Sequence, residues 1–227
     1  MHLKKYFSQL ATDNSQTHLD HYYNQTVAAA VDVRLPAYMY IAIKTIKYDE
    51  VLQMTTMVKW DVRDIMSQHN AYVDVMIKEL RSFKTKLSVV CTRELNAQLP
   101  PDAHDLIWSQ ILKLCNRTFV EGFSQAKKCT NEGRALMQLD YQQFLNQVQQ
   151  IVVIKPIPEK EMVEDYVKAF YLNEQSLEQW MKSRKEYTAK QLINLVNCMM
   201  ADSKRSRQRL VAIVEAEYGL SSNGKSN

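Results

Sequence analysis

His18, Asp20 and His21 are the residues of this 227-residue sequence that most resemble a metal site, because imidazole and carboxylate groups stand there at helical spacing. A usable metal site needs three or four converging ligands. The pattern therefore favours polar positions on the surface of an amphipathic helix, and we predict neither a metal nor a cofactor. The remaining histidines are isolated in the sequence: His2, His69 and His104.

Other groups that could perform acid–base or nucleophilic chemistry have simpler explanations. Neighbouring carboxylates such as Glu159 and Glu161 fall where a helix is expected to begin, and acidic side chains at that position complement the helix dipole. No serine or cysteine stands in a recognisable nucleophile motif. The chain has only 4 glycines, which excludes the glycine-rich loops that bind phosphates and dinucleotides. The sequence therefore predicts a protein that is not an enzyme.

The cysteines show neither metal-ligand spacing nor a disulfide framework. The sequence also contains no segment that resembles a signal peptide or a membrane span. We therefore predict a cytoplasmic protein whose thiols are reduced and pack as small apolar groups. The four thiols belong to Cys91, Cys115, Cys129 and Cys198.

A basic cluster near the C-terminus is the remaining candidate site. It consists of four cations in the stretch KRSRQR, namely Lys204, Arg205, Arg207 and Arg209. The formal net charge is +4, so the chain is neutral outside this cluster. A nucleic-acid binder usually carries a broad basic face with a pI above about 9. The sequence pI is 8.7, and we predict no nucleic-acid partner.

Three interpretations of the basic cluster remain open. Contact with an anionic membrane surface would contribute about 1 kcal/mol for each cation near the surface. Contact with an acidic partner protein is the second interpretation, and a solvated helix end with no binding role is the third. Lys127 and Lys128 would extend the basic surface only if the fold brings them close to the cluster.

The chain is poor in residues that interrupt helices, and its apolar residues recur at three- and four-residue steps. We predict a helix over roughly 3–32 that is terminated by Pro36, because the residue before a proline is displaced from the helical region. Residues 37–98 contain neither glycine nor proline and predict two long helices with a break near 67–70. Pro100 and Pro101 mark a connection followed by a helix start.

Further helices are predicted in the second half of the chain. One spans about 131–152, one follows Pro158, and the last spans about 204–218. The stretches 176–179 and 188–191 fit the capping-box pattern of a helix start. Gly122 lies on an apolar helix face, which indicates a place where a neighbouring helix packs closely.

The predicted fold is therefore all-α: an elongated bundle of about eight to ten stacked antiparallel helices. Residues 1–220 are expected to form a single domain, with two sub-bundles meeting near 99–102 as a variant of this arrangement. Residues 221–227 are expected to form a disordered tail. No fixed-period repeat was found, which disfavours a regular solenoid.

Four long stretches carry a resemblance to a known family. They are RLPAYMYIAIKTIKYDEV at 34–51, VKWDVRDIMSQHNAYVD at 58–74, NEGRALMQLDYQQFL at 131–145 and IKPIPEKEMVEDYVKAFYL at 154–172. Together they resemble the C-terminal region of the syndetin family, and the similarity extends over most of the chain. Syndetins are the distinguishing subunits of EARP, the endosome-associated recycling complex.

The resemblance implies a function that the composition could not indicate. EARP and its sister complex GARP share their other three subunits and belong to the multisubunit tethering complexes, whose rods of stacked helical bundles capture vesicles before SNARE-driven fusion. A protein of this family is expected to act in the return of internalised cargo from endosomes to the plasma membrane. Its expected location is peripheral, on recycling endosomes, with trans-Golgi network membranes as a second site.

The resemblance also implies partners. The subunits shared by EARP and GARP are expected to be bound through the full-length protein, since the N-terminal coiled-coil part that assembles such complexes is not represented here. SNARE proteins and an anionic membrane surface are further candidates. The family has no catalytic motif to carry over.

Overall fold

The computed structural model describes residues 13–22, 30–94 and 99–219, and all regular structure within these ranges is helical. The all-α prediction is therefore confirmed for this part of the chain. The elements are α2 (Asp13–Tyr22), α3 (Ala30–Thr45), α4 (Tyr48–Thr56), α5 (Ala71–Val89), the π-helix η2 (Val90–Glu94), α6 (Pro101–Ser124), α7 (Asn131–Ile151), α8 (Lys160–Ala169), α9 (Glu174–Ser183), α10 (Ala189–Met199) and α11 (Lys204–Glu217).

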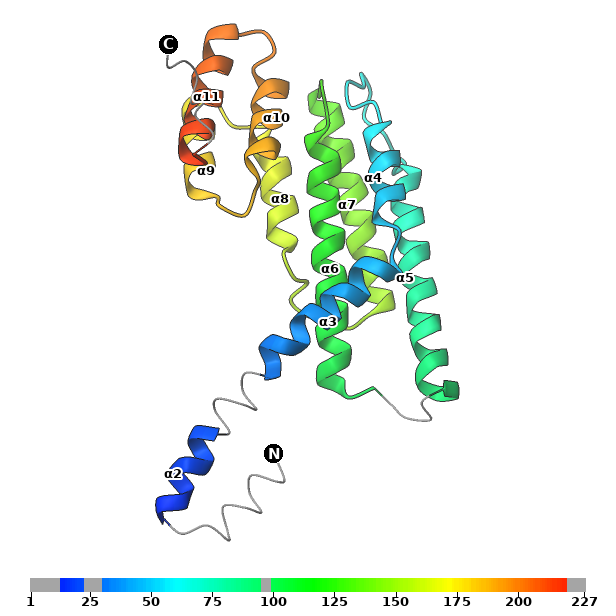
Figure 1. Cartoon of the computed structure of the whole chain (residues 1–227). Helices are drawn as coiled ribbons and strands as arrows, with labels where there is room; N and C mark the ends of the chain where they lie inside the picture. Colours follow the sequence, from blue (N-terminus) through cyan, green and yellow to red (C-terminus); the bar gives the residue numbers. More distant parts are fainter. Residues whose placement is uncertain (1–12, 23–29, 95–98, 220–227) are drawn as a thin grey trace, which may run out of the picture.

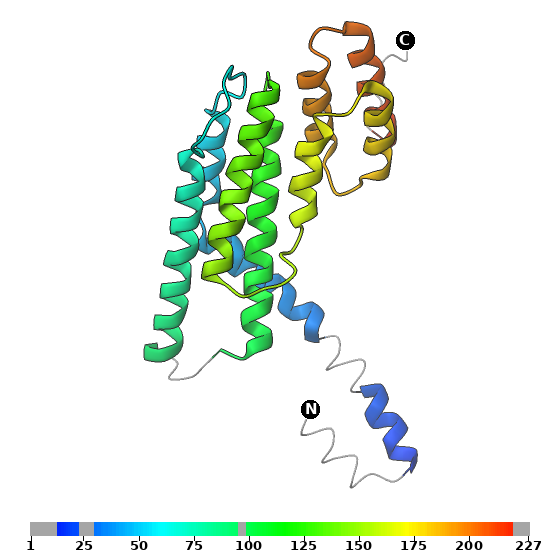
Figure 2. The same ribbon diagram turned by 180° about the vertical axis from the view of Figure 1, so that it is seen from behind.

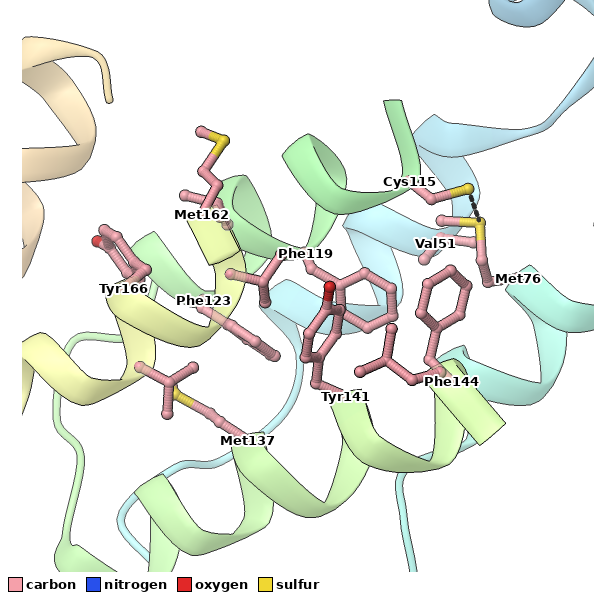
Figure 3. Packing of buried hydrophobic residues seen from close by; sticks show 14 of the residues in the cluster. Val51, Met76, Cys115, Phe119, Phe123, Met137, Tyr141, Phe144, Met162 and Tyr166 are labelled. Atoms are coloured by element: carbon pink, nitrogen blue, oxygen red, sulfur yellow. Dashed lines mark hydrogen bonds between the residues drawn. The ribbon is translucent and has the colours of Figure 1, made fainter. Parts of the chain in front are cut away.

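Helices α4 to α7 enclose an aromatic core (Figure 1). Phe119 of α6 lies at its centre, with its ring centroid 4.8 Å from that of Phe144 and 5.4 Å from that of Tyr141, both on α7. The ring of Tyr72 from α5 completes the cluster at 5.9 Å. Figure 3 shows these α6 and α7 side chains interdigitating, with Met76 and Cys115 beside them. Burial of such large apolar groups is the main stabilising term of a helical bundle.

A buried carboxylate connects α7 to the start of α5. Asp140 has no exposed surface, and it accepts hydrogen bonds from the Tyr72 hydroxyl at 2.5 Å and from the backbone and side-chain amides of Asn70 at 2.8 and 2.9 Å. Burial raises the pKa of Asp140, and these hydrogen bonds partly oppose that shift. Asp140 thus supplies the acceptors that the buried donors of Asn70 and Tyr72 require.

The C-terminal helices form a second, smaller group. Helix α8 packs against α6, and α11 packs against both α9 and α10. Two buried tyrosines link α8 to its neighbours: the Tyr166 hydroxyl donates to the carbonyl of Gln191, and the Tyr187 hydroxyl donates to that of Met162. The apolar interior of this group is made mostly of aliphatic residues: Leu177, Leu192, Leu195, Val196, Leu210 and Val214.

Several predicted helix starts are confirmed. Pro101 is the first residue of α6. Thr188 and Gln191 form the predicted capping box at α10, with both reciprocal hydrogen bonds present. The capping box predicted at Ser176 is wrong, because α9 begins three residues earlier and Asn173 caps it by accepting from the Ser176 backbone N–H. Asparagine is at least as good an N-cap as serine.

The prediction that Pro36 terminates a helix is also wrong. Pro36 lies inside α3, where it lacks an N–H to donate to the carbonyl four residues before it. Helix α3 packs closely across α6, with Ala42 fully buried and Tyr38 and Ile41 against the core. This packing accounts for a helix that continues through its proline. The part of the predicted first helix at 3–12 and 23–29 lies outside the described residues.

Residues 37–94 contain more interruptions between helices than predicted. A break occurs at Ile46 and Lys47, between α3 and α4, and the predicted break near 67–70 is the end of a longer irregular segment that begins at Met57. Helices on both sides of 99–102 pack against one another, α4 with α6 and α5 with α7. The division into sub-bundles at 99–102 stays a prediction, and the tail at 221–227 lies outside the described residues.

Candidate interaction surface

The predicted basic cluster lies in the first turns of α11, which Ser203 caps by accepting from the Ser206 backbone N–H. Lys204 and Arg205 are exposed. Neither has a carboxylate within 4 Å in the described part of the chain. Arg207 is half-buried and donates to the carbonyl of Ala201 at 3.5 Å. These three cations therefore surround the turn that joins α10 to α11.

Arg209 differs from the other three cations, because its guanidinium is held by two carboxylates of α9. It donates to Glu174 through Nε at 3.0 Å and Nη2 at 2.9 Å, and to Glu178 through Nη1 at 2.6 Å. Hydrogen bonds from Ser206 and from Arg209 lower the pKa of Glu174, and those from Lys182 and Arg209 lower that of Glu178. The structure thus assigns Arg209 to the contact between α9 and α11 and not to a free basic surface.

Sequence reasoning did not identify the carboxylates that neutralise Arg209. Glu174 and Glu178 stand four residues apart, so they share one face of α9, and this spacing was the available signal. Because they lie 35 and 31 residues before Arg209, only the arrangement of α9 and α11 brings them to it.

Lys127 and Lys128 lie at the same end of the molecule as the start of α11. Figure 1 and Figure 2 both show the α6–α7 connection, the irregular segment after α4 and the α10–α11 turn at that end. Thr130 joins two of these segments, since its backbone N–H donates to the carbonyl of Trp60 at 3.1 Å and its hydroxyl to that of Val62 at 2.7 Å. A methyl group at Gly133 would collide with the same Trp60 carbonyl, so this contact depends on glycine.

Gly122 is buried on the face of α6 that contacts α4. A Cβ atom placed there would lie 2.5 Å from Cγ2 of Thr55 and 2.9 Å from its Cβ. Real Cβ atoms do not approach so closely, so α4 can occupy this position only against a residue without a side chain.

The other candidate chemical groups are not brought together in the described residues. No group of three or more histidine, cysteine or acidic side chains has metal-binding geometry there, and His18 and His21 are exposed on α2. All four cysteines are free. Burial raises the pKa of Cys129 to about 12 and that of Cys198 to about 11, so these thiols stay protonated and unreactive near neutral pH.

No helix among the described residues is both long enough and apolar enough to cross a bilayer.

The family and the individual proteins that this chain matches agree with one another. The family model described as the C-terminal region of syndetin matches residues 1–215. Rat and mouse syndetin are each 46% identical over 199 residues, and chicken syndetin is 45% identical over the same length. These matches cover 87% of this chain and 20–21% of the relatives, so the chain spans about a fifth of their length. No solved structure matches. The chain belongs to the syndetin family and corresponds to its C-terminal region.

Proposed function

We propose that this chain is the non-catalytic C-terminal module of a vesicle-tethering subunit that acts in endocytic recycling from endosomes to the plasma membrane. The family match over residues 1–215 is the observation that supports this proposal. The helical fold agrees with it, since the stacked helices of a tethering rod serve to present surfaces and need no reactive centre.

The same proposal assigns partners and a location. The full-length protein binds the subunits that EARP and GARP share, and SNARE proteins are further candidates. The module lies on the cytoplasmic side of recycling endosomes as a peripheral protein, with trans-Golgi network membranes as a second site. The chain spans only about a fifth of its relatives, so the tethering activity belongs to the whole subunit.

A replacement experiment tests the tethering proposal. In mouse cells that lack syndetin, the matching region of mouse syndetin is exchanged for this chain, and the return of a labelled internalised receptor to the cell surface is measured. We expect the chimaera to restore recycling, whereas mouse syndetin truncated before this region does not. A chimaera that is expressed normally and joins the complex but leaves recycling impaired would contradict the proposal.

A second candidate function is binding to anionic lipid through residues 204–209. The exposure of Lys204 and Arg205, with no carboxylate within 4 Å among the described residues, favours it. We expect the chain to co-sediment with vesicles that contain phosphatidylserine, and less so in 1 M salt, where charges are screened. The double variant Lys204→Glu/Arg205→Glu should lose this binding. Absence of binding by the unaltered chain would remove this candidate.

A further inference from the structure

Three segments from distant parts of the sequence meet at one end of the molecule. We call this surface the loop end and define it by residues 57–66, 125–132 and 199–207 (Figures 1 and 2). The hydrogen bonds of Thr130 to Trp60 and Val62 join the first segment to the second. Arg134 at the start of α7 partly opposes the rise that burial causes in the pKa values of Cys129 and Cys198. Its guanidinium lies 5.1 Å from the centre of the Tyr171 ring, just after α8, so the C-terminal helices approach the start of α7.

The loop end carries most of the net charge of the chain. Its segments contain seven cations and four carboxylates, so they account for three of the four net positive charges. Six of the cations are exposed, and none of these six has a carboxylate within 4 Å in the described ranges. The cations are Lys59, Arg63, Lys127, Lys128, Lys204, Arg205 and the half-buried Arg207, and the carboxylates are Asp61, Asp64, Asp202 and the half-buried Glu132.

Large apolar side chains are exposed on the same surface. Ile65 is 80% exposed, Met57 70% and Met66 45%, all in the irregular segment after α4. Met57 also lines a depression of about 390 Å³, which is formed by residues 56–61 and 125–128. Its lining includes Lys59, Lys127 and Lys128. Single exposed apolar residues are ordinary, but three of them among unpaired cations form an amphipathic surface.

We propose that the loop end is the face of this module that lies on an anionic membrane, with lysines of all three segments at lipid phosphates and with Met57, Ile65 and Met66 inserted among the head groups. This inference rests on the second candidate function and extends it, because it adds 57–66 and 125–128 to the basic cluster and leaves out Arg209. Interfacial binding grows with buried apolar area and with attraction to anionic lipid, and the loop end offers both.

The arrangement of the surface favours a bilayer over an acidic protein segment. The cations come from two connections and from the first turns of α11 at one end of the molecule, and only three of them line the depression. The apolar side chains are on an irregular connection rather than on a helix face that could pack against a partner helix. Chain segments α2 and α3 lead away at the other end of the bundle (Figure 1), so they leave the loop end uncovered.

Vesicle binding by the full 227-residue chain tests the inference. The vesicles contain phosphatidylcholine with about 30% phosphatidylserine or none, and the bound fraction is measured by flotation at low and at physiological salt. The variants are Lys127→Glu/Lys128→Glu, Lys204→Glu/Arg205→Glu and Ile65→Ser/Met66→Ser. The matched control is Lys78→Glu/Lys86→Glu, which makes the same charge change at two exposed positions on α5. Circular dichroism verifies that every variant is folded.

We expect each basic pair at the loop end to lower the partition coefficient by about tenfold or more. The apolar pair should lower it by about fivefold at both salt concentrations, because apolar insertion is not screened. The control pair should stay within about twofold of the unaltered chain.

Three outcomes would overturn the inference, and they are distinguishable. If only the 204–205 pair matters and the 127–128 pair behaves like the control, lipid binding stands but the composite surface is wrong. If the unaltered chain does not bind, the inference and the second candidate function both fail, whereas the tethering proposal is still decided by the recycling assay. Salt-dependent self-association of the chain without vesicle binding would assign the loop end to a second copy and would likewise refute the membrane contact.

Discussion

The two groups of helices hold together by different means. In α4–α7 the buried rings of Tyr141 and Phe144 pack within 6 Å of the ring of Phe119, and their contribution to stability is not directional. In α9–α11 the helices have at most 14 residues, the interior is largely aliphatic, and charged groups connect the helices at the surface. The stability of the first group should therefore respond mainly to core truncation, and that of the second also to pH and salt.

Truncation of the aromatic core should have the largest effect. Phe119→Ala removes the ring at the centre of the cluster, and a buried Phe→Ala change costs about 3–5 kcal/mol of unfolding free energy. Urea denaturation followed by circular dichroism measures it. Tyr40→Ala is the matched control, since Tyr40 is 64% exposed, and it should change stability by less than about 0.5 kcal/mol. A loss below about 1 kcal/mol for Phe119→Ala would mean that the core readily collapses around the gap.

Removal of the buried acceptor between α5 and α7 should have the next largest effect. Asp140→Ala leaves the Asn70 amides and the Tyr72 hydroxyl without their partner, and unsatisfied buried donors of this kind cost about 1–3 kcal/mol. Tyr72→Phe removes only one donor and should cost about 1 kcal/mol. If the Asp140→Ala variant were no less stable than Tyr72→Phe, the carboxylate would not have the structural role assigned to it.

The capping boxes provide a matched pair within the second group. Thr188→Ala deletes a cap that α10 uses and should cost about 1 kcal/mol. Ser176→Ala alters a position where the sequence pattern suggested a cap but Asn173 provides it, and it should cost less than about 0.5 kcal/mol. Thermal unfolding of both variants measures the two losses of stability. Equal losses would show that Ser176, and not Asn173, caps α9.

On acidification the stabilities of the two groups should change in opposite directions. This is the smallest of the four effects predicted here. The pKa values of Glu174 and Glu178 are lowered from 4.5, so their stabilisation is present above pH 4.5 and is lost as pH falls through the folded values. The pKa of Asp140 is raised from 3.8. The stability that arises from this shift is therefore fully present below pH 3.8 and is lost as pH rises through the pKa of the folded state.

Hydrogen exchange, corrected for the intrinsic rate at each pH, measures this difference helix by helix. Between pH 6 and pH 3, we expect protection in α9 and α11 to fall relative to that in α5 and α7. Arg209→Gln should remove part of the pH response of α9 and α11, because Ser206 and Lys182 also lower the pKa values of Glu174 and Glu178. Screening in 1 M salt should reduce the response as well. Equal responses in both groups would show that the ion pairs with Arg209 do not hold α11 to α9.

Much of the fold could be predicted, because helix starts and apolar faces are encoded locally. Pro101 and Thr188 act on their own first turns, and the inward positions predicted for 131–152 are buried in the structure. The errors arose where distant contacts decide. Pro36 is retained in α3 by packing on α6. Trp60 lies outside any helix, and its buried ring packs against Phe123 of α6.

The candidate surface was predictable only in part for the same reason. The exposure of Lys204 and Arg205 follows from their place at a helix start in a charged stretch. The assignment of Arg209 to Glu174 and Glu178, and the approach of Lys127 and Lys128 to the same end of the molecule, depend on how whole helices are arranged. Local spacing carries no information about that arrangement.

The order of helix contacts has a consequence for synthesis. The main partner of α4 is α6 and that of α5 is α7, so the closest pairs interleave along the chain instead of forming successive hairpins. Translation is vectorial, at roughly 5–20 residues per second. A nascent chain that has exposed α4 and α5 still lacks α6, the partner of α4, until Ser124 has left the ribosome, and α7, the partner of α5, until Ile151 has left it. During those seconds the apolar faces of α4 and α5 are open to chaperones, and the aromatic core forms only once all four helices have emerged.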